Sequence, residues 1–438
     1  METHVGIVLL GCGVVGRGVL SILDQERDLL KQRTGIHFDV RHVVCRDVSK
    51  HADIAGVYQL TTNAEAAVTD PGVQIVVELM GGLEPAGGLI ARALKAGKHV
   101  VTANKALLAV RSAELFKLAK NHHVSIGFEA SCGGGIPIID ALTRGLLANR
   151  IDALLGIING TCNFILSQMS QHGWGYEQAL KEAQKLGFAE ADPTMDVNGR
   201  DTAQKLAILA SLAFNVAVGE QDIAVSGIDT LQADDIRYAA ELGYAIKLLA
   251  IAERVGESLA LRVHPTLVHN EDLLADVSGS FNAISVFGHA IGHQFFYGRG
   301  AGQMPTASAV VADLLGIAMG VIPHAFERLN VHTDLPPVKV LPPDQLESRY
   351  YLRVTTRDQP GAFAGITSAL GRHGISLKSV HQNETDTGDN PVPVVVTTHR
   401  AKQGAMTAAI REIDALPSIQ SPTICIRIID QPTEFGQV

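Results

Sequence analysis

The first residues of the chain join a short apolar run to a glycine motif, and this junction restricts the fold more than any other feature. Val5–Leu10 reads as a buried strand, Gly11-Cys12-Gly13-Val14-Val15-Gly16 follows at once, and a helix-like segment runs from Arg17 to Asp28. A strand, G-x-G-x-x-G and a helix in this order are typical of a dinucleotide-binding unit. The sequence therefore predicts an NAD- or NADP-binding domain.

Each glycine of the motif has a distinct role in such a unit. Gly11 permits the tight turn, Gly13 lets the backbone approach the pyrophosphate, and Gly16 allows the helix to pack closely. The first amides of the helix then face the phosphates. We expect the cofactor to contact Gly11, Gly13, Val14, Val15 and Gly16.

Strand and helix signals continue to alternate as far as about residue 135. The strands are Val40–Cys45, Val73–Leu79, His99–Thr102 and Val124–Phe128, and the helices are Leu89–Ala96 and Arg111–Asn121. This alternation predicts an α/β fold with a Rossmann-like, doubly wound nucleotide domain over residues 1–135. Ligands of such sheets lie beyond the carboxyl ends of the strands. Gly81 and Lys105, which each follow a strand, are therefore candidate cofactor residues.

The residues after the second strand bear on the choice of cofactor. Arg46, with Lys50 nearby, favours the 2′-phosphate of NADP, whereas Asp47 would suit the 2′-hydroxyl of NAD. A solvated turn without a ligand is the alternative. The sequence leans toward NADP and leaves NAD open.

From about residue 136 to 304 the alternation stops, which indicates a separate α+β catalytic and dimerisation domain. A glycine-rich turn, Glu129–Pro137, precedes it and could hold an ion or act as a hinge. A second glycine loop ends at Gly302, which we expect beside the cofactor, and a helix near residues 305–325 is expected to return to the nucleotide domain. The expected helices are Ile139–Leu147, Tyr176–Leu186, Asp201–Phe214 and Ile236–Arg254, and the expected strands are Leu154–Ile158 and Leu261–Leu267.

The stretch from Glu190 to Lys205 carries the strongest chemical signal, with four acids and two bases around one proline and one glycine. Pro193 and Asn198-Gly199 favour turns, and the helix that follows places Asp201 and Lys205 on one face. A lysine held by a carboxylate keeps its proton and can deliver it to an oxygen that becomes negative. A surface ion pair worth about 0.3–0.5 kcal/mol is the alternative.

A proline-rich linker separates the last part of the chain. Leu335-Pro336-Pro337 and Leu341-Pro342-Pro343 lie within it, over residues 327–348. Over residues 349–430, strand and helix signals then follow the order βαββαβ, which is typical of a ferredoxin-like domain. This part carries no catalytic constellation, so we expect it to bind a ligand or to associate.

Composition excludes several classes of function. The chain has 438 residues, 46% hydrophobic and 18% charged, as expected for a folded multidomain protein. Its net charge of −9 and lack of a dense basic run argue against nucleic acid as a partner. Five scattered cysteines favour a reducing, cytoplasmic location. No apolar stretch has the length of a membrane span, and the first residues do not read as a signal peptide.

Taken together, these features resemble bacterial homoserine dehydrogenases that carry a C-terminal ACT domain. The resemblance covers nearly the whole chain and rests on Gly11–Gly16, Val101–Lys105, Gly134–Pro137, Asn159–Asn163 and, above all, Asp192–Lys205. Asp358–Gly361 and Gly374–Ser376 are typical of ACT modules. The resemblance implies NAD(P)-dependent interconversion of L-homoserine and L-aspartate 4-semialdehyde, in the biosynthesis of threonine, methionine and isoleucine.

The resemblance also implies roles for single residues. Lys205 matches the proton donor, and Glu190, Asp196 and Asp201 match acids that contact the substrate. Lys105 and Gly187 match cofactor-side contacts. A sodium-binding loop is matched by Glu129, Cys132, Gly134 and Ile136.

Two of these positions depart from the pattern of the family. Cys132 stands where valine is expected, but the contact there is a main-chain carbonyl, so the change should matter little. Cys162 replaces a frequent threonine, which bears on the shape of its turn. The resemblance further implies inhibition by threonine through the ACT domain, and a homodimer or homotetramer.

Two other functions stay open from the sequence. A non-catalytic NADP-binding regulator would bind the cofactor without oxidising homoserine, and the acid–lysine stretch argues against it. A related dehydrogenase would act on another small amino or hydroxy acid.

Overall fold

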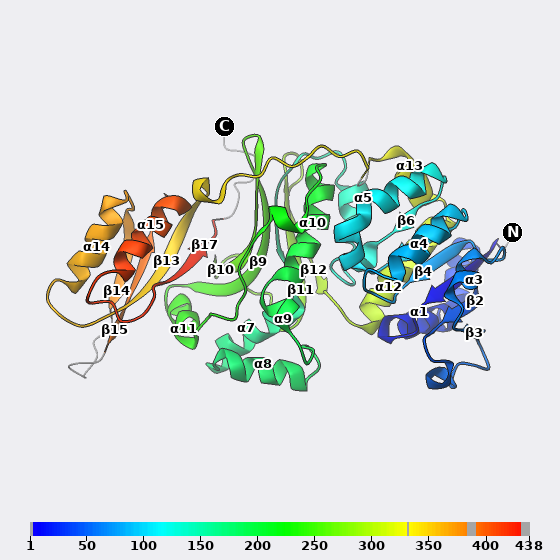
Figure 1. The fold of residues 1–438 in the computed structure, drawn as a ribbon, viewed down its shortest axis with the longest axis horizontal. Helices are drawn as coiled ribbons and strands as arrows, with labels where there is room; N and C mark the ends of the chain where they lie inside the picture. The colour runs from blue at the N-terminus through cyan, green and yellow to red at the C-terminus, as the bar shows by residue number, and fades with distance from the viewer. Residues whose placement is uncertain (1–2, 331–332, 383–390, 431–438) are drawn as a thin grey trace. The chain divides into compact units, whose positions relative to one another are not determined.

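The computed structural model describes residues 3–330, 333–382 and 391–430 (Figure 1). The chain forms two compact units, each built from three segments. The first unit comprises Met1–Leu154, Asp201–Gln221 and Phe281–Val338, and the second comprises Leu155–Arg200, Asp222–Ser280 and Lys339–Val438.

A six-stranded parallel sheet organises the first unit, with the strand order β3-β2-β1-β4-β5-β6. This is the 3-2-1-4-5-6 order of dinucleotide-binding folds, so the predicted Rossmann-like sheet is confirmed. The strands are β1 (Thr3–Leu10), β2 (Ile36–Val44), β3 (Leu60–Thr61), β4 (Ile75–Glu78), β5 (His99–Thr102) and β6 (Ile126–Gly127).

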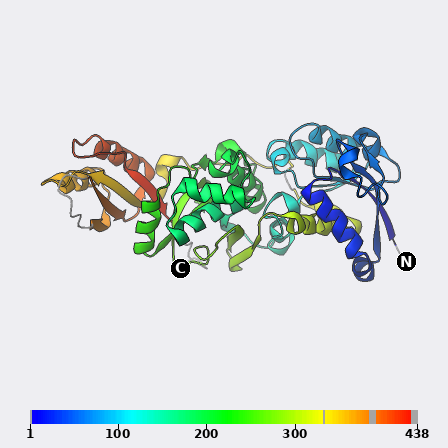
Figure 2. The ribbon, with the colours of Figure 1, turned by 90° about the horizontal axis from the view of Figure 1, so that it is seen from below.

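Helices accompany this sheet, and one of them comes from far along the chain. They are α1 (Val14–Gln25), α2 (Arg27–Thr34), α3 (Ala64–Thr69), α4 (Ala86–Lys95), α5 (Lys105–Asn121), α12 (Gln303–Ala318) and α13 (Val321–Arg328). Helix α12 lies beside α1 in both views (Figures 1 and 2). Gly18 permits this approach, because a Cβ there would lie only 2.9 Å from the Cβ of Ala307. Apolar residues of α12 such as Val310 and Leu314 complete the core around Ile7 and Leu9.

No single helix among the described residues has the length and apolarity to cross a membrane. Helices α12 and α13 satisfy the length and composition only as a pair, and the pair is bent by 78°.

The first unit also holds the elements that carry Asp201, Lys205 and the second glycine loop. They are α6 (Ile138–Asp140), a π-helical turn η3 (Ala141–Gly145), α10 (Arg200–Phe214) and the antiparallel hairpin of β11 (Phe281–Gly288) and β12 (Gly292–Arg299). Strand β7 (Ile151–Ile157) spans the boundary between the units.

In the second unit, a long antiparallel pair of strands joins the sheet of the C-terminal domain. Strands β9 (Tyr244–Val255) and β10 (Ser258–His269) pair along their whole length, and β10 also pairs with β17 (Ile424–Ile428). The other elements before the C-terminal domain are α7 (Gly160–His172), α8 (Tyr176–Lys185), α9 (Thr194–Val197), β8 (Ala224–Val225) and α11 (Ala233–Glu241).

The C-terminal part has the predicted βαββαβ order. Its elements are β13 (Glu347–Thr356), α14 (Ala362–Arg372), β14 (Leu377–Gln382), β15 (Val392–Thr398), α15 (Gln403–Asp414) and β17, with a short β16 (Ala401–Lys402) beside β13. Its strands pair in the antiparallel order β17-β13-β15-β14. Tyr350, Leu352 and Val354 of β13 form one core with Ile366 of α14 and Ile413 of α15. Both helices therefore cover the same face of the sheet (Figure 1).

The sequence-based expectation of one helix over Ile236–Arg254 is wrong. Helix α11 ends at Glu241, Gly243 has a φ of +84°, and Tyr244–Val255 is strand β9. The strand is buried on both faces, so its sequence lacks the apolar alternation that separates strands from helices. The segment expected as a helix over Ile139–Leu147 is also irregular, because α6 passes into the π-helical turn η3. The hairpin β11–β12 was not predicted.

Candidate active site

A cavity of about 1060 Å³ lies in the first unit, at the carboxyl ends of β1, β2 and β4. Its lining includes Gly11, Gly13, Arg46, Asp47 and Gly81. These residues come from three separate turns that the parallel sheet brings to one edge, where open α/β sheets bind their ligands. Sequence reasoning placed four of them at the cofactor, Gly11, Gly13, Arg46 and Gly81, and considered Asp47 for the ribose.

The glycine motif has the geometry that a pyrophosphate needs. Gly11 has a φ of +100°, and a Cβ there would lie 2.9 Å from the carbonyl oxygen of Leu79. A Cβ on Gly16 would lie 2.4 Å from the carbonyl oxygen of Gly11. At Gly13, a Cβ would meet no atom of the described residues within 4 Å. Gly11 and Gly16 therefore shape the turn, and Gly13 leaves the first amides of α1 open to an anion.

The turn after β2 carries one acidic side chain, Asp47, and two basic ones, Arg46 and Lys50. The Asp47 carboxylate accepts hydrogen bonds from the amide (3.0 Å) and the hydroxyl (2.6 Å) of Ser49, and these bonds lower the pKa of Asp47. It thereby caps the short helix η1 (Val48–His51). Arg46 and Lys50 line the cavity beside it. The acid is engaged in its own turn, and it lines the cavity together with the two cations.

A buried acid, Glu78, fixes the turns after β4 and β5. Its carboxylate accepts from the amides of Met80 (2.8 Å) and Gly81 (3.0 Å) and from the hydroxyl of Thr102 (2.7 Å). Asn104 caps α5 and donates from its side chain to the carbonyl of Gly82 at 2.7 Å. Sequence reasoning did not single out Glu78, although an acid that ends an apolar strand was a readable signal.

Three charged side chains converge where α5 begins and α10 passes. The Asp201 carboxylate accepts from Lys205 Nζ at 2.7 Å and lies 3.1 Å from Lys105 Nζ. The side chains of Asp201 and Lys205 are 9% and 13% exposed, and that of Lys105 is 37% exposed. One carboxylate therefore orients two ammonium groups. The Asp201–Lys205 contact follows from helical spacing, whereas nothing in the sequence pairs Lys105 with Asp201.

The glycine-rich loop expected to bind sodium packs against this cluster. The buried Cys132 thiol lies 3.9 Å from the carbonyl oxygen of Lys205, and burial raises the pKa of Cys132 to about 12. Gly134 has a φ of +58°, and a Cβ there would lie 2.4 Å from the carbonyl carbon of Gly300. This close approach joins the loop to the second glycine loop, whose Gly302 has a φ of +123° and precedes α12.

Glu129 begins this loop in the helical turn η2 (Glu129–Ser131). Its carboxylate accepts from the amides of Ile139 and Asp140, at 2.8 Å each, and burial raises the pKa of Glu129 to about 7. The carbonyl oxygen of Glu129 accepts from the amide of Cys132 at 3.4 Å, and that of Ile136 accepts from the amide of Ile138 at 2.8 Å. A carbonyl has two lone pairs, so both can also serve as ligands of a hard cation.

In the second unit, Asp196 forms hydrogen bonds with the turn at the start of α7. Its carboxylate accepts from the Asn159 amide group at 2.8 Å, and Asn159 in turn accepts from the amide of Cys162 at 2.8 Å. The Cys162 thiol donates to the carbonyl of Asp196 at 3.2 Å. Cysteine thus supplies a donor at the position where threonine is frequent. Glu190 is exposed, and Gly187, with a φ of +76°, follows α8.

Comparison with known proteins decides the family. The model of the homoserine dehydrogenase family matches residues 137–315, that of its NAD-binding domain matches residues 11–129, and that of the ACT domain matches residues 350–415. A homoserine dehydrogenase of Pseudomonas aeruginosa is 41% identical over 97% of this chain and 98% of its own length. The chain belongs to the homoserine dehydrogenase family. Members of this family are NAD(P)-dependent oxidoreductases, so the chain is an enzyme of that class.

Other relatives give the same result. A homoserine dehydrogenase of a Synechocystis species is 43% identical over 97% of this chain and 99% of its own length. Among solved structures, a homoserine dehydrogenase from Thiobacillus denitrificans matches with a TM-score of 0.91 and 43% identity, over 98% of this chain and 99% of the other. The agreement extends through the ACT domain, so the resemblance noted in the sequence is confirmed over nearly the full length.

Proposed function

We propose that this homoserine dehydrogenase interconverts L-homoserine and L-aspartate 4-semialdehyde, with Lys205 as the proton donor. The observation that carries the proposal is the Asp201 carboxylate held between Lys205 and Lys105. When bound, the nicotinamide would supply or accept the hydride. On reduction of the aldehyde, the Lys205 ammonium gives its proton to the carbonyl oxygen; on oxidation, the lysine takes the proton back from the hydroxyl.

The neighbouring charges support this role. Asp201 holds the Lys205 ammonium in one orientation, and it keeps the two lysines together despite their like charges. Lys105 adds positive charge beside the group that donates the proton, which favours the developing oxyanion. We assign Glu190 and Asp196 to the ammonium group of the substrate, because a substrate cation needs a carboxylate partner.

The variant Lys205→Met tests the proton donor. We expect turnover to fall by about 10²–10⁴-fold in both directions, while the dissociation constant for the nucleotide changes little. Lys117→Met, at an exposed position of α5, is the matched control and should behave as wild type. Turnover near the wild-type value in Lys205→Met would remove Lys205 from this role.

A panel of small amino and hydroxy acids, assayed with both nucleotides, separates a homoserine dehydrogenase from an enzyme for another substrate.

We also propose that NADP is preferred over NAD. Support comes from Arg46 and Lys50 at the cavity and from Asp47, whose carboxylate is taken up by Ser49. The ratio of kcat/KM for NADP to that for NAD should fall by about tenfold or more in Arg46→Ala, because a bidentate partner of the 2′-phosphate is lost. An unchanged ratio would assign the preference to another residue.

A sodium ion at the loop of Glu129, Cys132, Gly134 and Ile136 is a further part of the proposal. Main-chain carbonyl oxygens are hard ligands that suit such a cation, and Gly134, which lacks a Cβ, lets the loop pack closely against Gly300. Sodium chloride should raise the melting temperature more than choline chloride at equal ionic strength. Cys132→Val should keep this difference, and Gly134→Ala should abolish it.

For regulation and assembly, we propose that threonine binds the ACT domain and lowers activity, and that the protein forms a homodimer or homotetramer in the cytoplasm. Calorimetric titration of the full chain with threonine, with serine and leucine as controls, tests the effector. No heat of binding at millimolar threonine would reject it. Light scattering gives the mass of the assembly, with and without threonine.

A further inference from the structure

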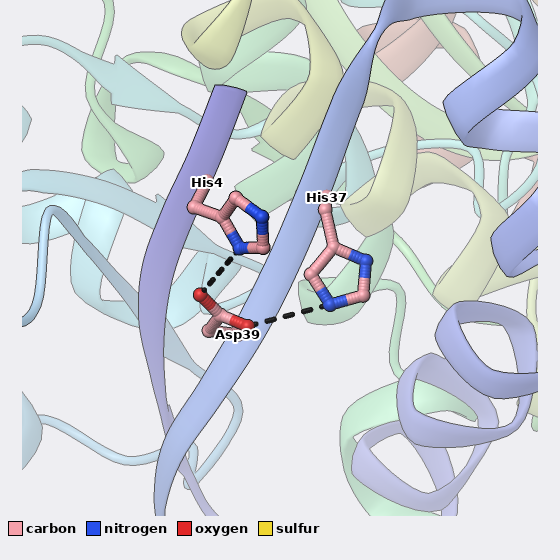
Figure 3. Close-up of side chains that lie close together, drawn as sticks. All are labelled: His4, His37 and Asp39. Atoms are coloured by element: carbon pink, nitrogen blue, oxygen red, sulfur yellow. Dashed lines mark hydrogen bonds and ion pairs between the residues drawn. The ribbon is translucent and has the colours of Figure 1, made fainter. Parts of the chain in front are cut away.

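The start of the parallel sheet carries a group of side chains that the proposed reaction does not use. His4 lies on β1, and His37 and Asp39 lie on β2 (Figure 3). The parallel register pairs His4 with His37, and residues two apart on a strand point to the same face. The three side chains therefore share one face by construction, while their neighbours Val5 and Phe38 join the apolar core on the other.

The candidate ligand atoms of this group lie close enough together to surround one metal ion. Asp39 places one carboxylate oxygen 3.1 Å from His4 Nδ1 and the other 3.3 Å from His37 Nε2. All the candidate ligand atoms lie within 4.8 Å of one another. Donors that surround a tetrahedral Zn²⁺ at about 2.0–2.1 Å are about 3.3–3.4 Å apart. The two distances to Asp39 already match this separation, so side-chain movements can bring the ligand atoms around an ion.

We propose that His4, His37 and Asp39 bind a divalent transition-metal ion such as Zn²⁺, Co²⁺ or Ni²⁺. Two imidazoles and one carboxylate suit these ions rather than Mg²⁺ or Ca²⁺, which take oxygen ligands. Water completes the coordination. Each imidazole binds through the nitrogen that faces Asp39, and the proton on that nitrogen moves to the other ring nitrogen or to solvent.

The site is separate from the chemistry of the enzyme. The cavity of the nucleotide domain follows the carboxyl end of β1 at Gly11, whereas His4 is at the amino end. At about 3.3 Å per residue, the strand separates the two by roughly 20 Å. The ion would tie the first strand of the sheet to the second, and its expected effect is on stability and not on turnover.

One neighbour opposes the ion and gives a diagnostic variant. Arg41, also on β2, lies 4.0 Å from the Asp39 carboxylate, and its side chain is 53% exposed. Because the guanidinium is exposed, it can swing into solvent when an ion binds. Removing its charge in Arg41→Gln should therefore tighten metal binding.

The test is titration of the metal-free full chain with Zn²⁺ and with Co²⁺, followed by calorimetry and by visible absorption. Wild type should bind an ion that His4→Ala and His37→Ala bind more than about tenfold more weakly. The metal should raise the melting temperature of wild type by several degrees and leave that of the two variants unchanged. His122→Ala, at an exposed position outside the group, is the control and should bind as wild type.

The proposal would be overturned by the absence of Co²⁺ absorption in wild type, or by equal affinity in wild type and His37→Ala. In the second case the three residues would be only a hydrogen-bonded group. Homoserine oxidation, measured in the same samples, should be unchanged in every variant. A loss of activity in His37→Ala with no change in metal binding would also reject the assignment.

Discussion

At the scale of single residues, one buried carboxylate holds two ammonium groups in place. Asp201 serves two lysines at 2.7 and 3.1 Å, and its side chain is only 9% exposed. Replacing it removes the carboxylate that both ammonium groups share, which weakens the positioning of both. The carboxylate is therefore as important to the proposed proton transfer as Lys205 itself.

The variant Asp201→Asn should lower kcat by about 10²-fold or more, because the amide cannot hold the Lys205 ammonium in a single orientation. Nucleotide affinity, measured by fluorescence titration, should stay within a few-fold of wild type. Asp28→Asn, at an exposed acid of α2, controls for the loss of one negative charge. A kcat close to wild type would show that Lys205 is oriented without Asp201.

Lys247 offers a test of stability against pH. Its ammonium donates to the carbonyl of Val277 at 2.6 Å, and burial lowers the pKa of Lys247 to about 8 from an ordinary value of 10.5. Between these values the unfolded chain binds a proton that the folded chain does not, so the free energy of unfolding rises with pH in this window. Below pH 8 the cost of burying the charge is constant.

We expect the free energy of unfolding of wild type, relative to Lys247→Met, to increase by as much as about 3 kcal/mol from pH 7.5 to 10.5. Urea titrations of both proteins at a series of pH values measure the difference. The hydrogen bond lost in the variant adds an offset that does not depend on pH. Parallel curves for the two proteins would show that Lys247 titrates at its ordinary pKa.

At the scale of elements, the turn between β1 and α1 separates a structural glycine from a binding glycine. A methyl group at Gly16 would press on the backbone of Gly11 at 2.4 Å, whereas one at Gly13 would project into open space. The two positions are only three apart in the sequence. Substitution by alanine should nevertheless lower the stability at Gly16 and the nucleotide affinity at Gly13.

In Gly16→Ala, helix α1 has to shift, and we expect a loss of about 1–3 kcal/mol in the free energy of unfolding. Gly13→Ala should unfold at the same urea concentration as wild type but bind the nucleotide at least about tenfold more weakly, because its methyl group occupies the approach of the pyrophosphate. Urea titration and nucleotide titration of both variants give the comparison. Equal effects of the two substitutions would contradict it.

At the scale of the whole molecule, the second unit ties its C-terminal domain to the preceding chain by a buried ion pair. Asp235 of α11 is 0% exposed and accepts from Arg353 of β13 at 2.7 Å, with Tyr351 as a further partner. Strands β10 and β17 pair beside them. The ACT domain is therefore built into the sheet of this unit, and its removal would expose the edge of β10.

The variant Arg353→Met should cost about 3–5 kcal/mol of unfolding free energy, because it leaves the Asp235 carboxylate buried without its cationic partner. The double variant Asp235→Asn with Arg353→Met should recover part of this loss. Arg237→Met, which removes an exposed pair with Asp234, should cost less than about 1 kcal/mol. Urea titration of the three proteins decides whether the buried pair contributes as described.

The sequence by itself determined the elements whose signals are local. The glycine motif, the Asp201–Lys205 spacing on α10 and the βαββαβ order all follow from rules that act over a few residues: allowed φ values, helical periodicity and turn chemistry. Where a local rule fails, as in the doubly buried strand β9, the sequence-based prediction fails as well. Burial on both faces removes the alternation on which the rule depends.

The tertiary structure alone decided which distant residues meet. Lys105 reaches Asp201, Asn159 holds Asp196, and His4 lies beside His37, although long stretches of chain separate each pair. Such pairings depend on strand order and helix packing, which the whole apolar core sets through many weak contacts. No short segment contains that information. The proposed proton donor, Lys205, could be predicted from the sequence, whereas the contact of Lys105 with Asp201 and the histidine group could not.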